Sequence, residues 1–188
     1  MPGMKQAIPW TPVFDWPLRL LLGLALGAAF LYAGAQKYLA PYEFAEAILA
    51  YQLLPDALVA LTAAVLPWLE LAVGALLVFG YLAETGRRLG AGLGLGFADG
   101  QAAGLLRRSA LLLILLQLLG FMAVLLITMA RGLKIDCGCG LFFQRLVGWA
   151  AVLEDLLLFG AAAWLYWREG MIDQEKGVTP VPVSPYGT

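Results

Sequence analysis

Two cysteines occur in this chain, and both lie in the short sequence Cys137-Gly138-Cys139. The chain contains no histidine, so this pair is the evident centre for redox or nucleophilic chemistry. A disulfide between residues i and i+2 closes a very small ring, in which the preferred Cα separation of about 4.4–6.8 Å and the preferred dihedral are hard to satisfy together. The glycine between the cysteines relieves backbone restriction. Because strained, exposed disulfides exchange readily, the spacing favours a catalytic or relay bond over a structural one.

Charged neighbours modulate the reactivity of this pair. Arg131, Lys134 and Arg145 favour the thiolate, whereas Asp136 opposes it. Two other interpretations stay open, namely two unpaired thiols or half of a metal site. Two thiolates without histidine need a second subunit to complete four zinc ligands, so the sequence predicts no complete metal site.

Glu70 is the second residue whose side chain could take part in chemistry. It lies three positions after Pro67 in an apolar stretch. An ionisable group at bilayer depth is costly and usually faces the bundle interior with a partner. Pro67 frees the carbonyl of the residue four positions earlier and can kink the helix. Glu70 is therefore either a proton site or quinone-pocket acid, or a neutral carboxylic acid bonded to another helix through Gln117 or Tyr32.

The composition indicates which solvent surrounds these groups. Of the 188 residues, 62% are hydrophobic and 13% are charged, with a mean hydropathy of +0.82, whereas soluble domains carry about 25% charged residues. A helical span needs about 20 apolar residues. The sequence therefore predicts a polytopic helical protein in a lipid bilayer. The net charge of −1 gives no electrostatic case for nucleic acid.

The apolar runs predict an all-α fold, an integral membrane four-helix transmembrane bundle with one short interfacial helix after the first span. The expected segments are a leader at 1–17, spans at 18–39, 57–82, 109–130 and 146–167, an interfacial helix at 41–54, a Gly-rich connection at 84–108 and a flexible tail at 169–188. The interfacial helix begins at Pro41 and has Phe44, Ile48 and Tyr51 on one face.

Several polar and small residues within the spans carry their own expectations. We expect Arg19 and Lys37 to snorkel at the two ends of the first span. Gly23 and Gly27 form a GxxxG step that permits close helix approach. Ala33-Gly34-Ala35 resembles a cleavage site, but the length of the run and the later spans favour a retained helix. Glu154 and Asp155 suggest a structural ion pair with Lys37 or Arg131.

Four spans put both termini on one side of the membrane, and the basic residues indicate which side. The side of the termini carries eight of them and the opposite side four: Lys5, Arg19, Arg87, Arg88, Arg107, Arg108, Arg168 and Lys176 against Lys37, Arg131, Lys134 and Arg145. The positive-inside rule therefore predicts cytoplasmic termini. The cysteines then face outward, which in a bacterium is the oxidising periplasm.

Several of these residues also resemble a known family. Arg19, Gly23, Gly34, Lys37, Pro41 and Phe44 resemble the opening of DoxX-like membrane proteins, and Leu66-Pro67-Trp68-Leu69-Glu70-Leu71 resembles their second-span signature. Asp136-Cys137-Gly138-Cys139-Gly140 is similar to the Cys-Gly-Cys loop of the MauE branch. The family usually continues Cys-Gly-Cys-Phe-Gly, whereas Gly140-Leu141-Phe142 follows here, and Glu154 stands where a basic residue is common. The resemblance covers about residues 18–168. It implies a redox-associated inner-membrane protein that works with a thioredoxin-like partner.

Together these features predict a membrane protein in which Cys137 and Cys139 exchange thiol and disulfide with a periplasmic thioredoxin-like protein or an exported substrate. Because both thiols lie on one side, electrons must pass to a quinone or a second protein, or stay on the outer face. No cofactor other than a quinone is suggested, and no oligomeric state is indicated. The alternatives are a non-catalytic membrane subunit or assembly factor, and a small-solute carrier built round Glu70.

Overall fold

The computed structural model describes residues 12–88, 100–133, 136–137, 145–146 and 148–177. They form helices α1 (Pro12–Leu39), α2 (Pro41–Ala50), α3 (Asp56–Arg88), α4 (Gly100–Ala130) and α5 (Trp149–Gly177), with a hairpin of β1 (Asp136–Cys137) and β2 (Arg145–Leu146). The hairpin is antiparallel. Most of the leader, residues 89–99 and the end of the tail lie outside the described residues.

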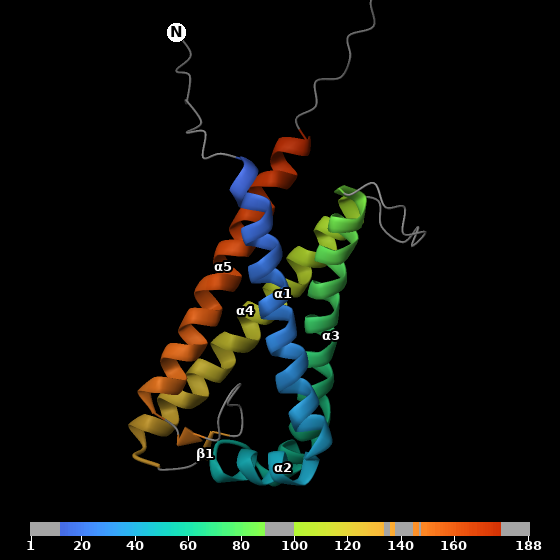
Figure 1. Ribbon diagram of the computed structural model, residues 1–188. Helices are drawn as coiled ribbons and strands as arrows, with labels where there is room; N and C mark the ends of the chain where they lie inside the picture. The colour runs from blue at the N-terminus through green and yellow to red at the C-terminus, as the bar shows by residue number, and fades with distance from the viewer. Residues whose placement is uncertain (1–11, 89–99, 134–135, 138–144, 147, 178–188) are drawn as a thin grey trace, which may run out of the picture.

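Four of these helices are long and apolar enough to cross a membrane, over Asp15–Leu39, Asp56–Arg88, Ala102–Ala130 and Trp149–Ile172. The predicted all-α fold of a multi-pass membrane protein, with one short helix after the first span, is confirmed. The spans alternate in direction (Figure 1). We call the end where α1 begins and α5 ends the terminal end. The end that carries α2, β1 and β2 is the hairpin end.

The helices of the second and third spans, α3 and α4, are longer than the sequence predicted. The Gly-rich connection expected over 84–108 is narrower, because α3 continues to Arg88 and α4 begins at Gly100. Glu84 accepts hydrogen bonds from both Arg87 and Arg88, the latter at 2.9 Å. Pairs three and four residues apart stabilise a helix, and cations near its C-terminus complement its dipole. These charges therefore extend α3 where a connection was expected.

Close packing of α1 on α3 depends on glycine. A Cβ on Gly74 would lie 2.8 Å from the Gly27 carbonyl oxygen, and a Cβ on Gly34 would lie 2.9 Å from that of Pro67. A Cβ on Gly23 would overlap the ring of Tyr81. Small residues let membrane helices approach until their backbones touch. The GxxxG step of the first span therefore lies in a helix interface, as its pattern suggested.

One apolar core joins the four spans. Its buried members come from α1, α3, α4 and α5: Leu26, Phe30, Val73, Leu77, Tyr81, Ala110, Leu111, Ile114, Leu118, Ala162 and Leu165. A smaller cluster of Leu125, Ala151 and Val152 joins α4 to α5 nearer the hairpin end. Without a hydrophobic driving force between helices in lipid, such packing contributes through dispersion and close fit. The core therefore fixes helix positions, and the polar groups described below lie on either side of it.

Helix α2 has the amphipathic character predicted for it. Phe44 and Tyr51 are buried and Ile48 is half-buried, whereas Glu43 and Glu46 are exposed. Pro41 occupies the first turn, where its missing N–H costs no helical hydrogen bond. The helix ends at Ala50, before a turn in which Gln52 has a φ of 52°. Its buried face therefore packs on the bundle at the hairpin end.

Replacing Gly74 by alanine tests the contact between α1 and α3. The new methyl would press on the Gly27 carbonyl oxygen and on Leu31, so Gly74→Ala should lower the free energy of unfolding by about 1–3 kcal/mol. The matched control is Gly120→Ala in α4, whose added Cβ meets nothing within 4 Å. Unfolding in detergent micelles measures both. Equal stability of the two variants would contradict the close contact.

Candidate functional site

The cysteine hairpin joins α4 to α5 at the hairpin end (Figure 1). Asp136 pairs with Leu146 and Cys137 pairs with Arg145 across its two strands. Cys139, the second member of the predicted pair, lies outside the described residues, and for Cys137 the structure describes the backbone. The hairpin thus places the backbone of Cys137 opposite a basic residue.

Glu70 forms a buried ion pair with Lys37. The Lys37 ammonium lies 2.8 Å from Oε1 and 2.9 Å from Oε2 of Glu70, and the two residues are 4% and 1% exposed. The rings of Phe44 and Phe121 have their centroids 5.6 and 5.7 Å from the ammonium. Lys37 therefore contacts α2, α3 and α4 from its place on α1.

This pairing corrects three expectations from the sequence. Lys37 does not snorkel to water, because a carboxylate on the neighbouring helix is within reach inside the bundle. The partner of Glu70 is not Gln117 or Tyr32, since Tyr32 is exposed and the Gln117 amide atoms have no hydrogen-bond partner among the described residues. Lys37 is consequently not the partner of Glu154 or Asp155.

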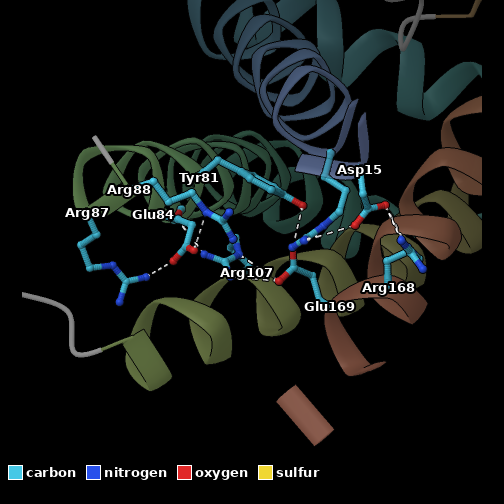
Figure 2. Close-up of polar contacts among 10 residues, drawn as sticks. Asp15, Tyr81, Glu84, Arg87, Arg88, Arg107, Arg168 and Glu169 are labelled. Carbon is cyan, nitrogen blue, oxygen red and sulfur yellow. Dashed lines mark hydrogen bonds and ion pairs between the residues drawn. The ribbon is translucent and has the colours of Figure 1, made fainter. Parts of the chain in front are cut away.

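A second buried cluster surrounds Glu169 near the terminal end (Figure 2). Its Oε1 accepts hydrogen bonds from Arg19 and, at 3.1 Å, from the Tyr81 hydroxyl. Its Oε2 accepts bonds from Arg107 Nε at 3.1 Å and Nη2 at 2.9 Å. Glu169 is 0% exposed, and the two arginines are 3% and 2% exposed. One carboxylate of α5 therefore bonds to α1, α3 and α4 together.

Partly exposed ion pairs surround this cluster. Arg168 Nε donates to Asp15 at 3.1 Å, and Asp15 lies 3.8 Å from Arg19. The guanidinium of Arg88 lies 4.1 Å from the centroid of the Trp16 ring. Arg107 also donates to the Gly80 carbonyl at 3.1 Å. The terminal end thus carries many arginine side chains, and carboxylates of the bundle neutralise part of their charge.

The Glu169 cluster is not among the features predicted from the sequence, because Arg19 was expected to snorkel and Arg107 to lie in a connection. A usable signal was present in the helical spacing. Ala103, Arg107, Ala110 and Ile114 recur at intervals of three and four residues, and all four are buried. An arginine on the apolar face of a span predicts a carboxylate partner in the bundle. For Arg107 of α4, this rule predicts Glu169 or Glu84 as the partner.

The described residues contain no group of three or more His, Cys, Asp or Glu side chains able to hold a metal ion. The chemistry that their buried polar groups support is charge pairing and hydrogen bonding. Glu154 is half-buried, and its Oε1 has no hydrogen-bond partner within the described part of the chain. The expected partner Arg131 instead donates to the backbone carbonyls of Tyr51 and Gln52.

Glu169→Gln tests whether one carboxylate holds the four spans together. The variant leaves the buried guanidinium of Arg107 without a counter-ion and leaves Arg19 only Asp15 at 3.8 Å, so the free energy of unfolding should fall by about 3–5 kcal/mol. Tyr81→Phe removes one neutral donor and should cost about 1 kcal/mol. Chemical unfolding in micelles gives both values. A smaller loss in Glu169→Gln than in Tyr81→Phe would contradict this role.

Comparison with known proteins agrees with this architecture. A family model described as methylamine utilisation protein MauE matches residues 15–168. The match extends from the first turn of α1 into α5 and so includes the four spans, α2 and the cysteine hairpin. Neither a curated protein nor a solved structure matches the chain. The resemblance seen in the sequence is confirmed, and the chain belongs to the DoxX-like MauE family.

Proposed function

We propose that this MauE-family protein exchanges thiol and disulfide at Cys137 and Cys139 with a periplasmic thioredoxin-like protein or an exported substrate. The observation that supports it is the hairpin. Both cysteines of the chain belong to the single connection between α4 and α5, at the end of the bundle away from α1's first turn. A connection that emerges from the bilayer can meet a soluble partner, which residues within the spans cannot do.

The exchange itself needs no additional reagent. One cysteine thiolate attacks a sulfur of the partner's disulfide, and the partner's other sulfur leaves as a thiolate. The second cysteine then attacks the mixed disulfide, so Cys137 and Cys139 become oxidised and the partner is released as a dithiol. The two protons of the thiol pair pass to the partner. The reverse sequence oxidises the partner.

The charge distribution supports an outward-facing hairpin. Among the described side chains, six arginines lie toward the terminal end, whereas Arg131 and the paired Lys37 lie toward the hairpin end: Arg19, Arg87, Arg88, Arg107, Arg108 and Arg168 form the first group. Basic residues are retained on the cytoplasmic side during insertion. In the proposal the termini are therefore cytoplasmic, in a bacterial or archaeal inner membrane, and the thiols face the oxidising exterior.

In the direction that oxidises the partner, Cys137 and Cys139 are left as a dithiol, so continued turnover needs an electron acceptor. In the proposal the acceptor is a membrane quinone or a second protein, and a quinone that takes two electrons and two protons from the thiols becomes a quinol. Glu70 is the candidate proton or quinone site. The Lys37–Glu70 pair supports this by offering an ammonium donor and a carboxylate acceptor beside Phe44 and Phe121.

Serine variants test the cysteine chemistry. In cells, Cys137→Ser or Cys139→Ser alone should accumulate mixed disulfides, because the resolving thiol is missing, and the double variant should form none. Non-reducing gels and mass spectrometry measure this. A membrane-impermeant maleimide should label the reduced wild type on intact cells. The control, Glu175→Cys in the double serine background, should be labelled only after membrane disruption.

Two results would contradict this proposal. Full cellular function of the double serine variant would favour the alternative of a non-catalytic subunit or assembly factor. Labelling of the wild type only in disrupted membranes would reverse the proposed orientation.

A paired substitution separates the structural role of Glu70 from a chemical one. Glu70→Gln leaves Lys37 buried and unpaired, so it should lower the free energy of unfolding by about 3–5 kcal/mol, whereas Lys37→Met with Glu70→Leu should cost less. If Glu70 serves a quinone or a proton, the double variant should stay folded and lose quinone-dependent reoxidation of the cysteines. Reoxidation at the wild-type rate in that variant would limit Glu70 to a structural role. Glu46→Gln, an exposed carboxylate on α2, is the control.

A further inference from the structure

The end of α4 is fixed by a specific backbone motif just before the cysteine hairpin. Gly132 has a φ of 70° and donates its N–H to the Met129 carbonyl at 3.0 Å, while Leu133 donates to the Thr128 carbonyl at 3.3 Å. These two bonds are those of a Schellman motif, in which glycine adopts the left-handed conformation without steric strain. The chain therefore leaves α4 at a defined residue and in a defined direction.

Arg131, the last residue before that glycine, bonds α4 to α2. Its Nη1 donates to the carbonyl oxygens of Tyr51 at 3.2 Å and of Gln52 at 3.1 Å. The Tyr51 carbonyl belongs to the C-cap of α2, the negative pole of that helix, and the Gln52 carbonyl lies in the turn that follows it. Hydrogen bonds from a charged donor contribute more than neutral ones. The buried side chains of Phe44 and Tyr51 in turn hold α2 on the bundle.

The hairpin is too small to hold a fixed position by its own interactions. Each strand has two residues, and an isolated two-stranded hairpin is at best marginally stable in water. β1 begins five residues after Arg131, and α5 begins three residues after β2. We call the two hydrogen bonds of Arg131 to the carbonyls after α2 the tether. The tether and the start of α5 are thus the two fixed points from which the hairpin extends.

We propose that Arg131 is a positioning residue for the cysteine pair, a role that rests on the proposed function. By holding the end of α4 against α2, it fixes where Cys137 is presented to a protein partner. A thioredoxin-like protein must dock a surface and align three sulfur atoms, so its rate depends on the position of the hairpin. A small thiol approaches from any direction, so its reaction rate does not depend on the position of the hairpin.

The tether is distinct from a direct effect of Arg131's charge on the thiolate. A nearby cation lowers the pKa of a thiol, so losing it would alter the reaction with every thiol reagent, large or small. Losing a tether would slow a protein partner alone and would loosen the hairpin. The size dependence of the rate therefore separates the two roles.

The experiment uses the full chain in nanodiscs, with its cysteines oxidised by diamide. Reduction by thioredoxin and by dithiothreitol is followed for wild type, Arg131→Gln, Arg131→Lys and the control Arg87→Gln, an arginine at the terminal end. Arg131→Gln should slow thioredoxin about tenfold, equivalent to about 1.4 kcal/mol, and leave the dithiothreitol rate within about twofold. Arg131→Lys should recover part of the loss, and Arg87→Gln should change neither rate.

Hydrogen exchange on the same samples supplies a second readout. Amides of β1 and β2 should exchange faster in Arg131→Gln, while those of α1 and α3 stay unchanged. An equal fall of both reduction rates would overturn the positioning role in favour of a charge effect, and unchanged amide exchange would overturn the tether. A wild-type protein inert to both thiols would overturn the proposed function itself, a result distinct from either of these.

Discussion

The structure depends on the rule that a charge inside lipid must find its counter-ion inside the protein. Arg19, Lys37 and Arg107 are buried, and two carboxylates, Glu70 and Glu169, bond to all three. Among the residues that the structure describes, neither carboxylate bonds to a cation of its own helix. Breaking a buried ion pair leaves a charge that no water can solvate, which makes its loss far more costly than its presence is stabilising. The ion pairs therefore specify which helices meet and at what depth.

Steric and electrostatic constraints act at one interface between α1 and α3. Gly34 packs against the Pro67 carbonyl and the Cβ of Glu70, and Lys37 lies one turn further along α1. A side chain at position 34 would push the helices apart and carry the ammonium away from its carboxylate. The glycines that let the backbones touch thus also set the length of the Lys37–Glu70 bonds. The same approach brings Phe44 of α2 over the ammonium.

Composition and periodicity predicted the four spans, the short helix and the need of Glu70 for a partner. They did not identify that partner, because snorkelling to water and pairing within the bundle both satisfy a lysine near the end of a span. Local sequence patterns could not predict the Glu169 cluster either, since Arg19 and Glu169 lie 150 residues apart. Helix ends were misjudged where Arg87, Arg88 and Arg107 suggested water and in fact continue α3 and α4. The extension of α3 depends on the local pairs of Glu84 with Arg87 and Arg88, whereas that of α4 includes the tertiary contact of Arg107 with Glu169.

The location of Glu169 on the final helix has a consequence for biogenesis. Spans enter the bilayer in chain order, so Arg19 and Arg107 are already at their depth in the nascent chain before α5 leaves the ribosome. Until then the carboxylate that bonds to both arginines is missing, and the bundle lacks the contact that joins all four spans. A chain interrupted before α5 therefore lacks the carboxylate to which Arg107 bonds and leaves Arg19 only the contact with Asp15.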